Sequence, residues 1–322
     1  MRIIFAGTPR AAVPTLRTLL ASPHEVAAVL TRPPARSGRG RTLHPSPVAE
    51  AATGAGVPLI EASSVRDEEV RERISGVGAD LGVVVAYGAI IPPDVLTTPR
   101  LGWINLHFSD LPRWRGAAPV QWAILAGDTR TASSVFQLEE GLDTGPVFSR
   151  LDVDVDHDTA GELLARMADL GAHQVLEVVD ALGAGTAHAV PQDLGPDASR
   201  LIHARKLVAA DGFVDFHDTA EEVDRRIRAT TPDPGAWTTT PDGRRLKMEA
   251  VTAIEGTTSG PGVVVATKNE VTVGCGSGAV RLGRVAPAGK GWMDAAAWAR
   301  GARLDEGAQL GTGSADTGEG SR

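Results

Sequence analysis

The chain has 322 residues, a net charge of −8, 42% hydrophobic residues and a mean hydropathy near zero. These values are typical of a globular protein with a sizeable core, and the length allows two domains. The single cysteine, Cys275, excludes an internal disulfide framework and a cysteine-rich zinc site, and it fits a reducing cytoplasm. The longest apolar run, residues 81–91, is far shorter than the ~20 residues that span a bilayer. We therefore expect a cytoplasmic protein with neither a membrane partner nor a metal.

Strands and helices alternate along the first half of the chain. Residues 2–9 form a strand that ends at a Gly-Thr-Pro turn, a helix runs through Leu20, and residues 26–31 form a second strand. This order predicts an α/β domain with a Rossmann-like parallel sheet. The turn lacks the G-x-G-x-x-G fingerprint, which disfavours NAD binding. Further helices are expected over residues 47–53, 67–74, 118–125 and 159–182, and further strands over residues 79–86, 103–108 and 133–138.

The second half of the chain has a different pattern. Residues 183–199 are rich in Gly, Ala, Pro and Asp, as in a linker. Beyond them we expect a helix over 220–228 and short strands over 236–239, 246–251, 262–267, 270–274 and 279–285, a spacing typical of a small OB-like β-barrel. We predict a catalytic domain over 1–189, a linker over 190–203, a barrel domain over 204–310 and a disordered tail over 311–322. A small excess of basic residues in 200–303 hints at a polyanionic partner.

A basic segment follows the second strand. It places Arg32, Arg36, Arg39 and Arg41 among Gly, Pro and Ser, without apolar periodicity, and predicts a mobile loop. Ligands of α/β proteins bind beyond the carboxyl ends of the strands, where this segment lies. We interpret it as a lid that grips phosphate, with a solvated surface loop as the alternative.

The strand around residue 105 carries the most informative polar pair. Asn105 and His107 are two residues apart, so their side chains share one face of the strand. An amide donor beside an imidazole suits a reaction in which a carbonyl is polarised while an amine loses a proton. Pro112, Arg113, Arg115 and Gly116 follow in a rigid cationic turn. The alternative is a polar strand end that only satisfies neighbouring backbone groups.

Two other segments are candidate parts of the same site. Gly141 and Gly145 flank Leu-Asp-Thr, which holds the carboxylate of Asp143 on a tight loop, although Asp143 could instead only close an Asx-turn. Tyr87-Gly88-Ala89-Ile90-Ile91 combines a glycine that lets a ligand approach the backbone with an apolar wall, and plain core packing is the alternative.

Taken together in this order, these motifs resemble the methionyl-tRNA formyltransferase family over nearly the whole chain. The segments that carry the resemblance are residues 4–9, 38–41 with 45–48, 84–88, 105–107 with 111–119, 141–145, 234–237 and 287–290. The resemblance implies transfer of a formyl group from 10-formyltetrahydrofolate to the α-amino group of methionine on initiator tRNA. Asn105 would donate a hydrogen bond to the oxyanion, His107 would take the amine's proton or, if charged, hold the oxyanion, and Asp143 would orient the imidazole or relay the proton through water.

The resemblance also implies the binding residues. The expected folate contacts are Tyr87, Gly88, Ala89, Ile90, Ile91, Ser109, Leu111, Pro112, Gly141 and Leu142. The expected tRNA contacts are Arg36, Arg39 and Arg41 in the basic loop and Lys206, Arg244, Arg245 and Lys247 in the barrel. No metal is expected, and the chain is expected to act as a monomer.

The chain departs from the family pattern at two positions. Asp110 stands where the family usually has leucine, and if it faced the site it would favour a charged His107. Phe216 stands where tryptophan is common. The main alternative is a sugar-nucleotide N-formyltransferase with the same cofactor and the same Asn-His-Asp site. A formyltetrahydrofolate hydrolase is disfavoured because no N-terminal regulatory domain is evident, and a non-catalytic RNA-binding protein is disfavoured by the intact trio.

Overall fold

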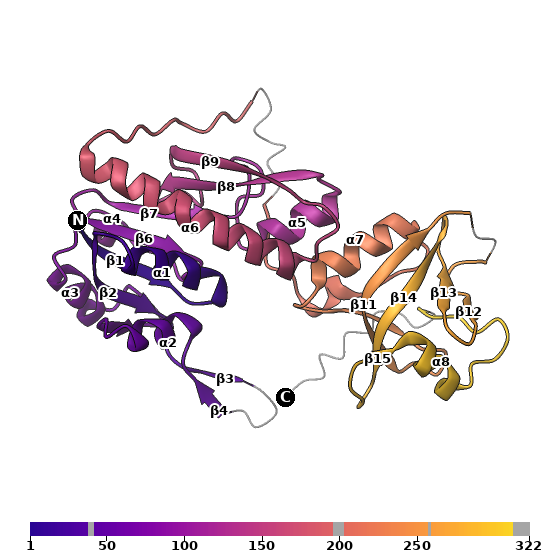
Figure 1. The fold of residues 1–322 in the computed structure, drawn as a ribbon. Helices are drawn as coiled ribbons and strands as arrows, with labels where there is room; N and C mark the ends of the chain where they lie inside the picture. Colours follow the sequence, from indigo (N-terminus) through magenta and orange to yellow (C-terminus); the bar gives the residue numbers. More distant parts are fainter. Residues whose placement is uncertain (38–41, 196–202, 257–258, 312–322) are drawn as a thin grey trace. The chain divides into compact units, whose positions relative to one another are not determined.

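The computed structural model describes residues 1–37, 42–195, 203–256 and 259–311. These form two compact units (Figure 1). The first unit comprises Met1–Pro119, Arg130–Asp154 and Leu164–Ala204. The second comprises Val120–Thr129, Val155–Leu163 and the chain from Arg205 onward. No helix in the described ranges is long and apolar enough to cross a membrane.

The first unit is built on a seven-stranded sheet in the order β5-β2-β1-β6-β7-β8-β9. The predicted parallel sheet contains five parallel strands: β1 (Arg2–Gly7), β2 (Glu25–Thr31), β5 (Leu59–Glu61), β6 (Leu81–Val85) and β7 (Trp103–His107). Of these, β5 was not predicted. All five residues of β6 are buried, which explains its continuous apolar sequence. The sheet then continues with two antiparallel strands, β8 (Arg130–Gln137) and β9 (Val147–Asp154). The sequence did not predict β9.

Helices connect the strands at the positions that the periodicity predicts, within a few residues. They are η1 (Arg10–Ala12), α1 (Val13–Leu20), α2 (Pro47–Gly54), α3 (Glu68–Gly76), α5 (Pro119–Ala126) and α6 (Ala160–Ala184). The short helix α4 (Pro93–Leu96) was not predicted. The hydroxyl of Ser46 caps α2 by accepting from the Ala49 amide at 3.0 Å. In α6, Gly171 allows close approach to Leu106 of β7, and Gln174 accepts a hydrogen bond from Ser133 at 2.6 Å.

The basic segment contains regular structure, so the prediction of a loop without strands was wrong. β3 (Ala35–Ser37) and β4 (Thr42–His44) pair antiparallel and form a hairpin that projects from the first unit (Figure 1). The backbone pairing Arg36↔Leu43 needs no apolar periodicity, because both strands are exposed or peripheral, and this is why pattern reasoning missed it. Arg39 and Arg41 lie outside the described residues.

The second unit contains the predicted antiparallel β domain. Its strand order is β10 (Ala236–Thr239), β11 (Arg245–Ile254), β14 (Ala279–Pro287), β13 (Val271–Gly274) and β12 (Val264–Ala266), and β15 (Met293–Asp294) pairs with β14. The helices are η3 (Ala209–Gly212), α7 (Ala220–Thr230) and α8 (Ala295–Ala302), of which only α7 was predicted. A capping box of Thr219 and Glu222 begins α7. Val223, Ile227 and Trp298 pack in the core of this unit.

Candidate active site

Asn105 and His107 lie on β7, between β6 and β8. Asn105 pairs in register with Val84 of β6 and Phe136 of β8, and His107 pairs with Ser134. The neighbouring Ile104 and Leu106 are buried on this central strand, which fixes the direction of the polar pair. The Oδ1 atom of Asn105 is buried and has no hydrogen-bond partner among the described residues. A buried amide oxygen without a partner is costly, so this atom is a candidate acceptor for a hydrogen bond from a ligand.

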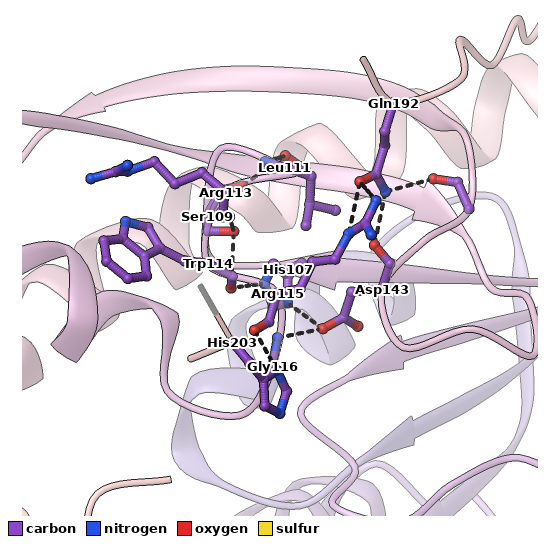
Figure 2. Close-up of polar contacts among 12 residues, drawn as sticks. His107, Ser109, Leu111, Arg113, Trp114, Arg115, Gly116, Asp143, Gln192 and His203 are labelled. Atoms are coloured by element: carbon purple, nitrogen blue, oxygen red, sulfur yellow. Dashed lines mark hydrogen bonds and ion pairs between the residues drawn. The ribbon is translucent and has the colours of Figure 1, made fainter. Parts of the chain in front are cut away.

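The imidazole of His107 is buried and held at one nitrogen. Its Nε2 atom lies 3.0 Å from the carbonyl oxygen of Trp114 (Figure 2). A carbonyl oxygen can only accept, so Nε2 carries a hydrogen and Nδ1 of the neutral ring holds the lone pair. The ring also meets Phe136 edge-on, with centroids 6.3 Å apart. The result is a histidine whose Nδ1 is the available base.

Asp143 faces that nitrogen. Its Oδ2 atom lies 3.9 Å from Nδ1 of His107, and both side chains are about nine-tenths buried. The same oxygen accepts a hydrogen bond from the Gly116 amide at 2.8 Å. At 3.9 Å the carboxylate is too far for a direct hydrogen bond to the neutral ring, but it is close enough to stabilise a proton that arrives on Nδ1.

The loop that carries Asp143 depends on its two glycines. A Cβ atom at Gly145 would lie 1.8 Å from the carbonyl oxygen of Gln137, and one at Gly141 would lie 2.3 Å from Oγ1 of Thr144. Asp143 itself has a φ of 52°, in the left-handed region. The Gly-Leu-Asp-Thr-Gly sequence is therefore a requirement of close backbone packing as well as of chemistry.

The turn over residues 87–91 follows β6, the strand next to β7 in the sheet. Gly88 in this turn has a φ of 85°. The ring of Tyr87 is in the core, its hydroxyl donates to the carbonyl of Ala62 at 3.1 Å, and burial raises its pKa to about 12. Tyr87 therefore offers a ligand only its backbone. Ile90 is 76% exposed and Ile91 is buried, so Ile90 is the apolar side chain that this turn presents to solvent.

Hydrogen bonds of Ser109 hold the segment after β7 in place. Ser109 donates to the carbonyl of Arg113 at 2.6 Å and accepts, through its own carbonyl, a hydrogen bond from Ser134 at 2.7 Å. Ser109 and Leu111 are buried, Pro112 is half-buried, and Leu142 is 57% exposed next to Asp143. Some of the predicted cofactor contacts, such as Ser109 and Leu111, are therefore buried within the loops. Others, Ile90 and Leu142, are apolar side chains exposed to solvent.

Asp110 does not point at His107. Both of its carboxylate oxygens pair with the guanidinium of Arg150 on β9, and the contact to Nη2 measures 2.8 Å. Arg150 also pairs with Asp152 at 2.8 Å. The charge introduced at position 110 is thus neutralised at the edge of the sheet, and it anchors the 109–112 loop to β9.

The predicted tRNA contacts fall on two surfaces. Arg36 is exposed on β3 of the hairpin. In the second unit Lys206 and Lys247 are exposed, Arg244 is paired with Asp242 at 2.7 Å, and the guanidinium of Arg245 lies 4.2 Å from the ring centroid of Trp237. Within the described residues, no cluster of three or more histidine, cysteine or acidic side chains could hold a metal ion.

A contact between Arg115 of the cationic turn and Gln192 connects these loops, and it was not predicted. Arg115 donates to the side-chain oxygen of Gln192, and Gln192 donates to the backbone carbonyls of Asp143 and Gly145 (Figure 2). Gln192 lies in the segment expected to be a linker, where composition gives no signal of a role in the site.

Comparison with known proteins decides the family. The profile described as "Formyl transferase" matches residues 1–179, and "Formyl transferase, C-terminal domain" matches residues 206–303. Two curated proteins named methionyl-tRNA formyltransferase are similar over nearly their whole length. The one from Salinispora tropica is 48% identical over 96% of this chain and 100% of its own length, and the one from Clavibacter sepedonicus is 50% identical over 94% and 97%. The chain belongs to the methionyl-tRNA formyltransferase family.

Solved structures show the same fold at much lower identity. HypX from Aquifex aeolicus aligns with a TM-score of 0.67 and 17% identity over 95% of this chain, and this chain spans about half (48%) of HypX. WlaRD, a sugar 3N-formyl transferase, aligns with a TM-score of 0.63 and 14% identity over 90% of this chain and 98% of WlaRD. These structures share the mostly parallel sheet followed by an antiparallel β domain. The family profiles and the curated relatives show that this chain is a formyltransferase.

Proposed function

We propose that this protein transfers the formyl group of 10-formyltetrahydrofolate to the α-amino group of methionine on initiator tRNA. The observation that carries the chemistry is the 3.9 Å approach of the Asp143 carboxylate to Nδ1 of His107. Asn105, with its partnerless Oδ1, lies two residues before His107 on the same strand. The near full-length similarity to curated methionyl-tRNA formyltransferases supports the choice of acceptor. Folate ligands are named for structures of the same fold, HypX and WlaRD, and they support the choice of donor.

The three side chains divide the work of an acyl transfer. The formyl donor supplies an electrophilic carbon and an amine leaving group. The Asn105 amide would donate a hydrogen bond to the formyl oxygen as negative charge develops there, a contribution of about 2.7–4 kcal/mol in comparable sites. Its partnerless Oδ1 would accept an N–H of a bound substrate, because a buried amide oxygen is stable only when paired.

His107 would move the proton. Because Nε2 is committed to the Trp114 carbonyl, Nδ1 would take the proton that the attacking amine loses and then return it to the folate nitrogen as that nitrogen leaves. Asp143, 3.9 Å away, would stabilise the imidazolium between these two steps. The overall balance is one N–C bond formed, one N–C bond broken and one proton carried across, with no covalent enzyme intermediate.

We assign the two binding partners to two proposed domains. We take residues 1–189 as the catalytic domain, 190–203 as a linker and 204–310 as a tRNA-binding domain. The folate would lie against the 87–91 turn, Ser109, Leu111, Pro112, Gly141 and Leu142. Arg36, Arg39 and Arg41 would contact the acceptor end, and Lys206, Arg244, Arg245 and Lys247 the acceptor arm, through phosphate contacts that weaken as salt rises. The active species would be a cytoplasmic monomer.

A side-by-side transfer assay tests this function. Purified protein and 10-formyltetrahydrofolate are supplied with methionyl initiator tRNA, methionyl elongator tRNA or an amino-sugar nucleotide. The proposal expects rapid formylation of the initiator tRNA and little formylation of the other two acceptors. Preferential formylation of the amino-sugar nucleotide would replace this function with the sugar-nucleotide N-formyltransferase alternative.

A further inference from the structure

Gln192 uses every hydrogen-bonding group of its side-chain amide. Its Oε1 atom accepts from Nε and Nη2 of Arg115 at 3.1 and 2.6 Å. Its Nε2 atom donates to the backbone carbonyls of Asp143 and Gly145, both at 2.8 Å. A primary amide offers two acceptor sites and two donors, so this half-buried side chain is fully satisfied by two loops alone (Figure 2).

Each of these two loops makes contacts that fix a proposed catalytic side chain. On one side, Arg115 lies between Trp114, whose carbonyl fixes Nε2 of His107, and Gly116, whose amide binds the Asp143 carboxylate. On the other side, Gln192 binds the backbone of Asp143 directly. The Gln192 amide therefore connects the support of the imidazole to the support of the carboxylate.

The Asp143 loop needs such an external support. Asp143 has a φ of 52°, a conformation that persists in a residue with a side chain only where surrounding contacts hold it. Burial lowers the pKa of the Arg115 guanidinium and the nearby charge of Asp143 opposes that shift, so Arg115 is bound within the electrostatic reach of the site. A neutral amide can join this cation to two carbonyl oxygens without adding charge next to His107.

Gln192 is itself fixed to the sheet. Two residues earlier, Val190 exchanges backbone hydrogen bonds with Val147 of β9, at 2.8 and 2.9 Å. The predicted linker thus begins at a residue that pairs with the edge strand β9. This pairing holds Gln192, two residues later, next to the Asp143 loop. Rigid attachment on one side and four hydrogen bonds on the other are the features of a preorganising support.

We propose that Gln192 is a positioning residue for the formyl-transfer site, which sets the separation of the Asp143 carboxylate and the His107 imidazole. This inference rests on the proposed function for the reaction that it serves. It assigns to the linker a role in turnover, and it predicts that the linker residue acts through Asp143 and not through substrate binding.

Two substitutions separate the two halves of the amide. Gln192→Glu keeps an acceptor for Arg115 but turns a carboxylate oxygen toward the carbonyls of Asp143 and Gly145, which repels the loop. Gln192→Met removes both halves at similar volume. Gln309→Met, at an exposed glutamine of the second unit, is the matched control.

Steady-state kinetics and amide hydrogen exchange are measured on the full chain. We expect both Gln192 variants to lose at least 10-fold in kcat while the KM values for donor and tRNA change less than 3-fold and the melting temperature stays within about 2 °C. We also expect faster exchange of the Gly116 amide, which donates to Asp143, whereas Gln309→Met matches the wild type. Wild-type kcat in Gln192→Glu, or a loss shared equally between kcat and KM, would overturn the proposal.

The exchange measurement separates the two hypotheses. If the wild type formylates no tRNA, the proposed function fails, yet the Gly116 amide still reports whether Gln192 positions Asp143. Unchanged Gly116 exchange in both variants would overturn the positioning role whatever the reaction.

Discussion

Nδ1 of His107 lies 3.9 Å from Oδ2 of Asp143, although the two residues come from different elements of the chain. One is at the end of β7 and the other is on a glycine-bounded loop after β8. Because Nε2 of the same imidazole is bound to the Trp114 carbonyl, the carboxylate faces the nitrogen that remains to carry a proton. This geometry supports the proposed role of His107 as the group that carries the proton.

Replacing Asp143 by Asn should slow turnover by about 10²–10⁴-fold, the range that general acid–base catalysis contributes, because the proposed imidazolium would lose its nearby negative charge. The amide oxygen can still accept from Gly116, so folding is expected to be retained and the loss to appear in kcat. Asp67→Asn is the control, since Asp67 is exposed before α3 without a side-chain cap hydrogen bond and its replacement should change activity less than 3-fold. Equal activities of the two variants would contradict the role of Asp143.

Asn105→Ala should lower kcat by about 10²–10³-fold, the cost of removing one oxyanion donor. Affinity for tRNA should change less than 3-fold, because the proposed role of Asn105 is to bind the oxyanion and not the phosphate backbone. Pre-steady-state transfer together with filter binding measures both quantities. Similar losses in turnover and in tRNA affinity would refute the assignment.

Gly145→Ala should destabilise the Asp143 loop and reduce kcat at least 10-fold. The new Cβ atom would lie 1.8 Å from the Gln137 carbonyl, and overpacking of this kind costs about 1–3 kcal/mol. Gly54→Ala, where a Cβ atom meets nothing within 4 Å, should leave both stability and kcat nearly unchanged. Denaturant titrations and rate measurements on the two variants test this difference, and a tolerated Gly145→Ala would show that the loop is not closely packed.

Burial raises the pKa of the Cys275 thiol to about 11 from its ordinary value of 9.0. At pH 8 only about one native thiol in a thousand is ionised, so iodoacetamide should label Cys275 slowly in the folded protein and rapidly in concentrated urea. Between pH 9 and 11 the folded state holds a proton that the unfolded state releases, so stability should fall as pH rises, by at most about 3 kcal/mol. Cys275→Ala should lack this component of the pH dependence; an identical pH dependence in both proteins would contradict it.

Lys247→Ala should weaken tRNA binding more than Arg244→Ala does. Arg244 is already paired with Asp242, whose pKa it lowers to about 2, whereas Lys247 is exposed on β11. If Lys247 contacts a phosphate, its removal should also reduce the slope of log K against log salt by about one. Binding isotherms at several salt concentrations measure this slope, and an unchanged slope would remove Lys247 from the interface.

The sequence predicted the strand that carries Asn105 and His107, because alternation on a buried strand is a local property. It also singled out Asp143, because glycines on both sides of a carboxylate indicate a tight loop. The distance between His107 and Asp143 could not be predicted, since it depends on the Gly116 amide and on Gln192, which are remote in sequence. The β3–β4 hairpin and β9 were missed for a related reason: exposed strands paired through backbone atoms have little apolar signal.

The most direct test of the proton-transfer role is single-turnover transfer of a labelled formyl group to methionyl initiator tRNA, compared between the wild type and His107→Gln. The amide nitrogen of glutamine can take the place of Nε2 and donate to the Trp114 carbonyl, but the amide cannot accept a proton at neutral pH. We predict that the wild type forms formylmethionyl-tRNA and that the variant forms it at least 100-fold more slowly while binding tRNA with similar affinity. Transfer by the variant at the wild-type rate, or no transfer by the wild type, would contradict the account.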